Sequence, residues 1–294
     1  LHPRVRRQRQ MCIRDRYNFI SGIILDENND EMFVNCAAAK KIYVYDLSGN
    51  FKRSFAHPKD TEYMDVLNYD KDNLICYDAS VYYKDGQSRE EGKSYHSLIS
   101  KKDGSVTRDI YLPYDIIKTP CVHQGDGVAM TSVRPIIPNR GEWLLVDCSS
   151  DTVYNYVPEK NKLVPFFVKA PTKDPEILLT MGAVTDRYYF LHTVKKEFDF
   201  TTGRGFFMND FMYDKQTNEL YKAKVLNSDF VKKRSVDMFL HPINNNGIAA
   251  VQTLSAGQLV EAYQEDGLKG RLKEVAAGLD EESNPVVMLV KYKN

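Results

Sequence analysis

The feature of the sequence that most limits its fold is a pair of alternating segments that recurs along the chain. Residues 40–55, KKIYVYDLSGNFKRSF, place alternating apolar side chains on both sides of a Ser-Gly-Asn turn. The pattern returns in altered form at 94–112, 151–167 and 206–226. Alternation with a period of two around a polar turn predicts a β-hairpin. Its recurrence predicts a fold built from repeated units.

The alternation in the first hairpin also predicts which side chains share a face. Successive side chains of a strand point to opposite faces of the sheet. Ile42, Val44 and Leu47 should therefore face one side, and Tyr43 and Tyr45 the other.

A further pair of strands precedes each hairpin. These pairs lie at 20–37, at 63–79, at 127–133 with 142–148, and at 176–194. Each unit then has four strands, and the predicted units are 17–60, 61–114, 115–171 and 172–228. A four-stranded sheet of about 40–50 residues is the blade of a β-propeller.

The chain ends in an incomplete fifth unit. Two strands are predicted within 235–254, a helical insertion follows, and a last strand is predicted at 285–293. Ser255 is the expected N-cap of the first helix, because Ser side chains accept hydrogen bonds from free backbone N–H groups there. Helical spacing predicts two apolar faces, one of Leu259, Val260 and Tyr263, and one of Leu272, Val275 and Leu279.

The sequence therefore predicts an all-β fold, a β-propeller of four-stranded blades with a short helical insertion near the C-terminus. Residues 17–294 are expected to form a single propeller domain of about five blades, the last one incomplete. Propeller rings usually close by pairing strands from both termini, because sheet edges need partners. The C-terminal strand is present, so we expect that its N-terminal partner has been lost.

Residues 1–16, LHPRVRRQRQMCIRDR, are expected to be a non-native or disordered tail. The segment holds six Arg and one Asp, but it lacks the apolar stretch of a secretory signal. Met11–Arg16 matches the translation of a sequencing adapter, which favours a non-native origin over a genuine tail or a basic binding arm. The whole chain has a net charge of zero, so the remainder is acidic. Nucleic acid is therefore not an expected partner, since phosphates need clustered Lys and Arg.

Three segments carry a resemblance to a known family. They are GIILDENNDEMFV with the following KKIYVYDLSGNFKRSF, the segment DTVYNY, and the ending LKEVAAGLDEESNPVVMLVKYK. In this order they resemble a family of six-bladed β-propellers that gut bacteria secrete or anchor by lipid, distantly similar to NHL-repeat propellers. The resemblance implies six blades, with the first blade and a lipoprotein signal lacking here. It also implies a periplasmic or outer-membrane-anchored location, with the membrane reached only through that lipid anchor.

The sequence lacks the familiar catalytic motifs. It has no GxSxG, P-loop or HExxH, and its GxG at 201–207 lies between strands, where a flexible loop is expected. No cofactor is predicted. No CxxC pair occurs, and the cysteines outside the tail lie in apolar runs, which favours buried free thiols at Cys36, Cys76, Cys121 and Cys148.

Candidate ligand-binding residues come from several units. Three His lie in or beside strands that approach the central channel, although a single strand His is more often packed than ligating. Three Arg could clamp a carboxylate or contact a sugar or peptide. The expected set is His123, Arg134, Arg187, His192, Arg234, Asp237 and His241. Aromatic stacking is a further possibility, at Tyr82, Tyr83, Tyr188 and Tyr189, and residues 82–95 form a long charged loop between strands.

These observations predict a non-enzymatic binding propeller of the cell envelope. Loops at one face of the ring would recognise a glycan, a peptide or a protein partner. The alternative is a metal-dependent lactonase-type hydrolase or lyase that acts at the central channel. It would hold a divalent cation through carboxylates such as Asp26, Asp65, Asp186 and Asp237, although such residues at strand ends more often serve turns. A structural scaffold is the third class that the sequence leaves open.

Overall fold

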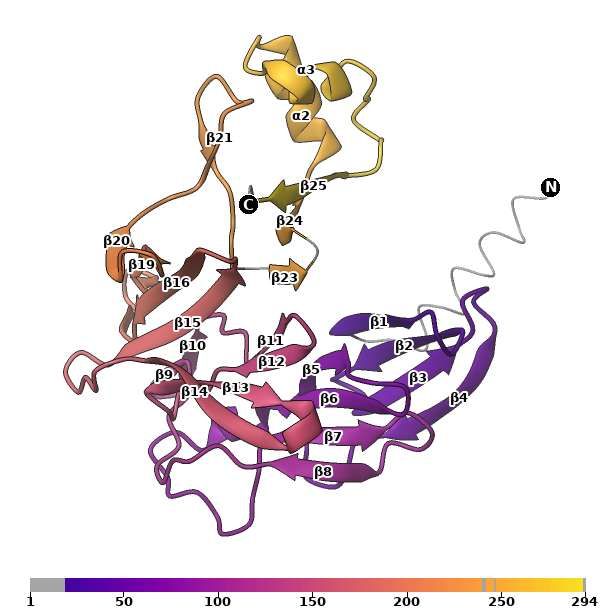
Figure 1. The fold of residues 1–294 in the computed structure, drawn as a ribbon, viewed down its shortest axis with the longest axis vertical. Helices are drawn as coiled ribbons and strands as arrows, with labels where there is room; N and C mark the ends of the chain where they lie inside the picture. The colour runs from indigo at the N-terminus through magenta and orange to yellow at the C-terminus, as the bar shows by residue number, and fades with distance from the viewer. Residues whose placement is uncertain (1–18, 240–241, 246, 293–294) are drawn as a thin grey trace. The chain divides into compact units, whose positions relative to one another are not determined.

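The computed structural model describes residues 19–239, 242–245 and 247–292 (Figure 1). The chain divides into two compact units, the first ending at Thr119 and the second beginning at Pro120. Within the described residues, four sheets have four strands each and a fifth has three. The strands of each sheet pair with their neighbours in chain order. This is the predicted blade pattern, and it is confirmed.

The first unit contains the first two sheets, whose neighbouring strands are all antiparallel. The first sheet consists of β1 (Gly22–Asp26), β2 (Glu31–Cys36), β3 (Lys41–Tyr45) and β4 (Phe51–Ala56). The second consists of β5 (Tyr63–Asn68), β6 (Asn73–Asp78), β7 (His96–Ser100) and β8 (Val106–Ile110). The leading strands β1 and β5 lie against each other, and the two sheets share one apolar core.

Alternation in β3 places its side chains as predicted, with one exception. Ile42 and Val44 are fully buried in the shared core, and Tyr43 and Tyr45 are half-buried on the other face. Leu47 is 43% exposed, so the prediction that it shares the buried face of Ile42 and Val44 is wrong. Because β3 ends at Tyr45, Leu47 lies in the turn, where the alternation of a strand no longer fixes direction.

The loop expected at residues 82–95 lies between β6 and β7, where it follows the short 3₁₀ helix η1 (Ala79–Tyr83). Tyr82 is half-buried, and its ring centroid lies 6.0 Å from that of Tyr77. Tyr83 is 75% exposed. Of these two candidates for stacking, Tyr82 therefore packs on its own sheet and only Tyr83 presents its ring to the outside.

The second unit contains, within its described part, three sheets and three two-stranded ribbons. The third sheet consists of β11 (Ile136–Asn139), β12 (Glu142–Leu145), β13 (Thr152–Val157) and β14 (Lys162–Val168). The fourth consists of β15 (Ile177–Val184), β16 (Tyr188–Lys195), β19 (Met208–Asp214) and β20 (Glu219–Lys222). The ribbons pair β9 (Cys121–Gln124) with β10 (Gly127–Met130), β17 (Phe198–Asp199) with β18 (Arg204–Gly205), and β21 (Leu226–Asn227) with β22 (Arg234–Ser235).

The leading strand of the third sheet differs from the prediction. Residues 127–133 were expected there, but β10 pairs with β9 in a separate ribbon, and none of its side chains is buried. The place is taken by β11, whose Ile136 and Ile137 are buried. Pro138 argues against a strand at the sequence level, because Pro has no backbone N–H to donate to a neighbouring strand. It is tolerated here because β11 is the edge strand of its sheet.

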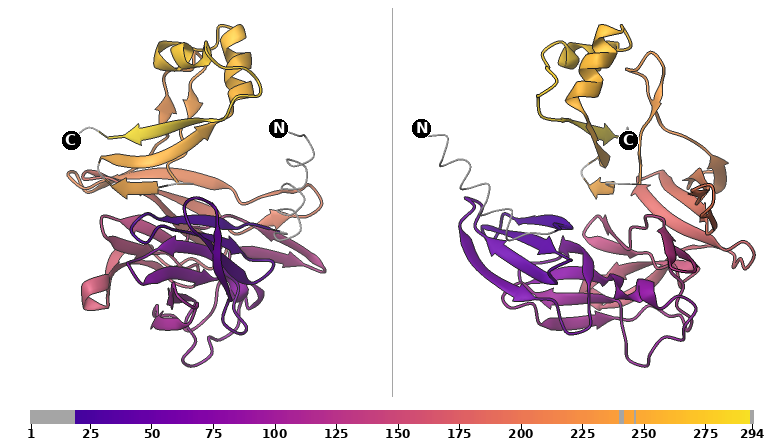
Figure 2. Two further views of the ribbon diagram at one scale, coloured as in Figure 1. Left: turned by 90° about the vertical axis from the view of Figure 1, so that its right-hand side faces the viewer. Right: turned by 180° about the vertical axis from the view of Figure 1, so that it is seen from behind.

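The fifth sheet confirms the predicted helical insertion and last strand. It consists of β23 (Pro242–Asn245), β24 (Ile248–Leu254) and β25 (Val286–Lys291), in that order. Two helices, α2 (Ala256–Gln264) and α3 (Gly270–Ala276), connect β24 to β25 and lie to one side of the sheet (Figure 2). They pack around their own apolar cluster, which also includes the half-buried Leu254 and Val286 at the sheet end.

The first helix begins where predicted but buries a different face. Ser255 occupies the N-cap position of α2, and its side chain makes no capping hydrogen bond. The buried side chains of α2 are Ala256, Leu259 and Ala262, and Tyr263 is 37% exposed. The prediction is therefore wrong at Tyr263, because the small side chain of Ala262 lets that position approach the neighbouring helix instead.

We expect Ser255→Ala to change the free energy of unfolding by less than about 0.5 kcal/mol, against the loss of about 1 kcal/mol that is typical of an N-cap. The hydroxyl makes no cap, and Ala keeps the backbone carbonyl that accepts from Leu259 N at 3.1 Å. Urea unfolding followed by circular dichroism measures the change. A loss above 1 kcal/mol would mean that the hydroxyl caps the helix in solution.

The described cysteines are all free thiols. Cys36, Cys76 and Cys121 are buried, and Cys148 is half-buried. Burial raises the pKa of the Cys76 and Cys148 thiols, so both stay protonated at neutral pH.

Three turns, β11–β12, β15–β16 and β19–β20, lie together at one end of the third and fourth sheets and surround a cavity. In an antiparallel sheet, the turns after the first and third strands lie at the same end. The β15–β16 and β19–β20 turns therefore lie together, and contacts between β11 and β15 bring the β11–β12 turn beside them.

Candidate functional site

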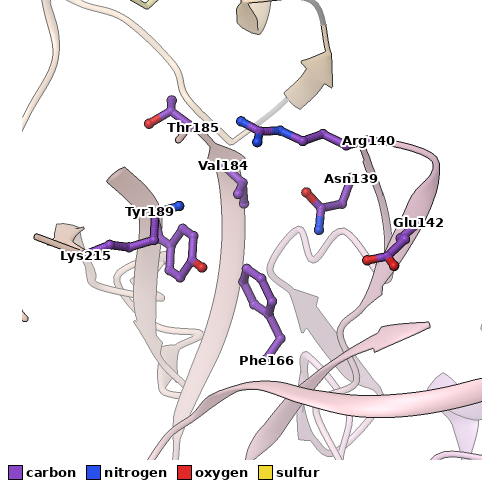
Figure 3. A pocket seen from close by; sticks show the side chains of 8 residues that line it. All are labelled: Asn139, Arg140, Glu142, Phe166, Val184, Thr185, Tyr189 and Lys215. Atoms are coloured by element: carbon purple, nitrogen blue, oxygen red, sulfur yellow. The ribbon is translucent and has the colours of Figure 1, made fainter. Parts of the chain in front are cut away.

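A cavity of about 180 Å³ opens between these turns (Figure 3). It is lined by Asn139, Arg140, Glu142, Phe166, Val184, Thr185, Tyr189 and Lys215. Small-molecule sites combine apolar walls with a few convergent polar groups, and drug-sized ligands occupy about 300–1,000 Å³. This cavity is smaller and more polar, with Phe166, Val184 and the Tyr189 ring as its apolar part. It therefore suits a single ring or the terminal group of a longer ligand.

The β11–β12 turn places Arg140 at the rim of the cavity. Asn139 pairs with Glu142 across this turn, which leaves Arg140 and Gly141 as its two central residues. Their φ angles are +54° and +85°. A type I′ turn requires positive φ at both central positions and favours Gly at the second. The sequence Asn-Arg-Gly-Glu therefore fixes the direction in which the Arg140 side chain leaves the sheet.

Two oxygen atoms hold the Arg140 guanidinium. Its Nη2 lies 2.5 Å from Asp186 Oδ1 in the β15–β16 turn and 3.2 Å from the Tyr292 hydroxyl oxygen. Burial lowers the pKa of Arg140, but Asp186 outweighs it, and the net shift is upward. Arg140 therefore joins the two sheets as a permanent cation.

Lys215 supplies a second cation at the cavity. Its Nζ lies 4.9 Å from the ring centroid of Tyr189, a cation–π distance. Among the described residues, no carboxylate forms an ion pair with Lys215. Desolvation and the nearby Arg140 lower the pKa of its ammonium group. The backbone N–H of Lys215 donates to Arg187 O at 2.9 Å, which fixes the position of its turn.

The wall opposite Lys215 carries hydrogen-bond acceptors. Asn155 Nδ2 donates to Glu142 Oε2, and Asn139 Nδ2 donates to Asn155 Oδ1 at 3.3 Å. Figure 3 shows Asn139 and Glu142 on one side of the cavity and Tyr189 and Lys215 on the other. The Asn155 side chain thus holds both residues in place through one amide group.

Two aromatic rings, Tyr189 on the Lys215 side and Phe166 next to it, form the apolar part of the cavity wall. The ring centroids of Phe166 and Tyr189 lie 4.8 Å apart, and Tyr189 stacks on Tyr213 at 5.8 Å. Burial and the neighbouring Tyr213 raise the pKa of Tyr189, so its hydroxyl stays neutral at physiological pH. Of the tyrosines predicted to stack on a ligand, Tyr189 is the one that lines the cavity.

Arg187 is the predicted binding residue that lies nearest to this cavity. It sits in the β15–β16 turn, but its guanidinium forms a bidentate ion pair with Asp214, with Nη2 2.7 Å from Oδ2. It also lies 4.9 Å above the Tyr188 ring. In this arrangement Arg187 joins the β15–β16 turn to the end of β19, and it does not line the cavity.

The structure brings two other predicted residues together away from the cavity. His192 is buried in β16, with its ring centroid 4.3 Å from that of Phe239. Asp237 is exposed and caps Phe239 N at 2.7 Å. Burial lowers the pKa of His192, while Asp210 and Asp237 act in the opposite direction. This His is therefore packed and neutral near pH 7.

The remaining predicted residues are dispersed. His123 is exposed on β9, Arg134 is half-buried just before β11, and Arg234 is exposed on β22 with its guanidinium 4.6 Å above the Phe230 ring. His241 lies outside the described residues. None of the described three lines the cavity.

The carboxylates considered for a divalent cation have separate roles. Asp26 is ion-paired to Lys101, Asp186 to Arg140, and Asp237 caps a backbone N–H. In the part of the chain that the structure describes, no three His, Cys, Asp or Glu side chains gather as metal ligands. The cation site of the hydrolase alternative stays a prediction.

Sequence reasoning did not single out Arg140, Lys215, Asn139 or Glu142. The segment Asn-Arg-Gly-Glu carries a usable signal, because a two-residue turn with Gly second presents the preceding side chain at the end of a hairpin. No comparable signal marks Lys215, which is one of several charged residues in a polar turn.

Comparison with known proteins decides the family. Residues 15–249 match the model of the DUF5128 family, which is described as a 6-bladed beta-propeller. The chain belongs to this family. The predicted six-bladed propeller is thereby confirmed for this DUF5128 protein, and its four-stranded sheets are the blades. A comparison with curated proteins finds no match.

Several solved structures are similar to this DUF5128 protein, and the first of the three below supports the same fold. A Bacteroides fragilis protein that is expected to be exported, BF0058, is 14% identical with a TM-score of 0.59, covering 95% of this chain and 78% of its own. A DUF4221 member from Bacteroides vulgatus (8% identity, TM-score 0.42) covers 67% and 65%. Virginiamycin B lyase from Staphylococcus aureus (12% identity, TM-score 0.32) covers 69% and 69%. Within the described residues, no helix has the length and apolar character needed to cross a membrane.

Proposed function

We propose that this propeller is a binding protein whose ligand occupies the cavity between the third and fourth blades. The ligand would be a small polar molecule or the terminal group of a glycan or peptide. The observation that carries this proposal is the convergence of acceptors, aromatic rings and a cation on one cavity, where Lys215 has no ion pair among the described residues. A cation held on an aromatic face without a counter-ion is available to an anionic ligand.

The groups around the cavity suit recognition better than catalysis. Nucleophilic catalysis needs a hydroxyl, thiol or amine hydrogen-bonded to a base. Of the residues that line the cavity, Thr185, Tyr189 and Lys215 carry such groups. The Thr185 hydroxyl is used by the backbone of Tyr188, at 2.8 and 3.1 Å, and no base among the described residues hydrogen-bonds to the Tyr189 hydroxyl or the Lys215 amine. Glu142 is oriented by Asn155 and could accept from a ligand. These roles support a non-enzymatic protein.

We further propose that the protein acts outside the cytoplasm, in the periplasm or on a lipid anchor at the outer membrane. The support is the similarity to BF0058, which is expected to be exported, and the resemblance of the sequence to secreted and lipid-anchored propellers. Its partner would then be a glycan, a peptide or a protein of the cell envelope. Fractionation of native cells with antibody detection tests the location, and a purely cytoplasmic signal would contradict it.

The binding proposal predicts that Tyr189→Leu weakens ligand affinity by about two- to tenfold. Aromatic contacts contribute about 0.5–1.5 kcal/mol beyond area burial, which gives this range. Isothermal titration against a panel of monosaccharides, glycan fragments and short peptides measures the affinity. The matched control is Tyr263→Leu, which removes an exposed ring on α2. Equal affinities for both variants would place the ligand elsewhere, and silence across the panel would contradict a binding role for the cavity.

A further inference from the structure

The cavity has hydrogen-bond acceptors on one wall and a cation on the opposite wall, and this arrangement restricts the chemistry of the ligand. On one wall, Glu142 Oε1 and Asn139 Oδ1 have no hydrogen-bond partner among the described residues, because Asn155 takes only Glu142 Oε2 and the Asn139 amide N–H. These oxygens accept hydrogen bonds. On the opposite wall, the Lys215 ammonium offers donors and a positive charge. A complementary ligand has hydrogen-bond donors at one end and an anion at the other.

The anion is expected at Lys215 rather than at Arg140. Arg140 already has Asp186 Oδ1 at 2.5 Å and the Tyr292 hydroxyl at 3.2 Å. A ligand would have to displace both to use the guanidinium. The Lys215 ammonium lies over the Tyr189 ring and, within the described part of the chain, forms no ion pair. Its charge can therefore be neutralised by a ligand without breaking an existing pair.

The shape of the cavity favours a ring over an extended chain. Phe166 and Tyr189, with ring centroids 4.8 Å apart, provide the aromatic faces of the cavity. The cavity has a volume of about 180 Å³. Asn139 and Glu142 are cross-strand partners, and both line the same side of the cavity. Hydroxyl groups of a sugar ring can donate to oxygens on this side while the carbon skeleton of the ring packs on the aromatic side chains. An ammonium can donate to the same oxygens, but it brings no apolar ring face.

We propose that the ligand class is a uronic acid, a sugar ring that carries a carboxylate. Its carboxylate pairs with Lys215, its ring packs on Phe166 and Tyr189, and its hydroxyl groups donate to Glu142 and Asn139. This inference rests on the proposed binding function and specifies the ligand of the same cavity.

Titration of the whole chain with glucuronic acid, glucuronamide, glucose and serine tests the inference. Glucuronamide keeps the ring and removes the charge, and serine offers a carboxylate with an ammonium but no ring. We expect glucuronic acid to bind at least tenfold more tightly than each of the other three. Lys215→Met should remove this preference, so that glucuronic acid binds no better than glucuronamide. Lys222→Met, which removes an exposed charge on the same sheet, should leave the preference unchanged.

The other outcomes contradict either the uronic acid inference or the binding function itself. If glucuronamide or glucose binds as well as glucuronic acid, the inference is wrong and the binding function stands. If serine binds most tightly, the ligand is an amino acid or peptide end, and the inference is again wrong. If Lys222→Met and Lys215→Met reduce binding equally, the charge acts at long range and Lys215 is not the receptor. If nothing binds, and no glycan fragment or peptide of the wider panel does, the binding function itself fails.

Discussion

Replacing Lys101 with Met is expected to lower the free energy of unfolding of the first unit by about 3–5 kcal/mol. Lys101 and Asp26 form a buried ion pair between the first two sheets, with Nζ 2.5 Å from Oδ2 and side chains 5% and 1% exposed. Lys101 Nζ also donates to the Asp70 carbonyl oxygen. Removing the cation leaves a carboxylate and a carbonyl in the interior without their main partner, which is the costly way to break a buried pair.

The charge state of Asp26 explains why the loss is large. Burial alone would raise the pKa of Asp26, but hydrogen bonds from Lys101 and Asn29 outweigh burial and hold that pKa below its ordinary 3.8. Without Lys101 only burial and the weaker Asn29 contact remain. The carboxyl group must then either stay charged in the interior or take up a proton at neutral pH. Either route lowers the stability of the folded state.

Guanidinium unfolding of wild type and Lys101→Met at pH 7 measures the loss. The matched control is Arg271→Met, which breaks a pair of similar length, 2.7 Å, whose side chains are 82% and 68% exposed. We expect a loss of less than about 0.5 kcal/mol there. A double variant, Asp26→Leu with Lys101→Met, should recover much of the stability, since no buried charge remains. If Lys101→Met were as mild as the control, water would reach the pair in solution.

The sheets could be predicted because the alternation of buried and exposed side chains along a strand is visible in the local sequence. Ile42 and Val44 alternate with Tyr43 and Tyr45, and this period alone identifies β3 and its buried face. Local sequence did not identify β11, because Pro138 is unfavourable in a central strand. It is tolerated because β11 lies at the edge of its sheet. Whether a strand is an edge strand is a property of the assembled sheet.

The cavity could be predicted only in part, because its residues come from turns that are distant in sequence. Tyr189 was a candidate for stacking on a ligand, and it lines the cavity. Arg187 was a candidate for clamping a carboxylate or contacting a sugar or peptide, but it is paired with Asp214. The structure instead places Lys215 at the Tyr189 ring. The sequence shows which residues are charged. It does not show whether Arg187 or Lys215 forms an ion pair with a carboxylate, because that depends on the register of β16 with β19.

The free energy of unfolding is expected to fall by about 3 kcal/mol between pH 7.5 and pH 4 through one His in the first unit. His57 is 7% exposed, and both ring nitrogens are used. Nδ1 accepts from Tyr63 N at 3.2 Å, so Nε2 carries the proton and donates to Asn35 Oδ1 at 2.9 Å. The Asn35 amide in turn donates to Tyr63 O at 2.7 Å. This buried network fits only the neutral imidazole.

The sign of the effect follows from the pKa of His57. Burial is the largest cause, Lys40 adds to it and Asp78 opposes it, and together they lower the pKa from 6.5 to about 4. Between these two values the unfolded chain binds a proton that the folded chain does not, so stability falls as the pH falls through this window. The carboxylates with lowered pKa, Asp26 and Glu31, lose their contribution below their ordinary values of 3.8 and 4.5. Their effect is therefore concentrated at lower pH.

Comparison with His57→Gln isolates this contribution. Gln is not protonated in this pH range, so the variant should lose less stability on acidification. It should be less stable than wild type at pH 7.5, because the contact between the imidazole and the Tyr63 ring is lost. Guanidinium unfolding at pH 7.5 and 4.5 measures both proteins. The wild type should lose roughly 2–3 kcal/mol more than the variant over this interval. Parallel profiles would mean that His57 titrates alike in the folded and unfolded chain. The Asn35–His57–Tyr63 network would then be open to water, and the fixed neutral tautomer would have no part in holding the first two sheets together.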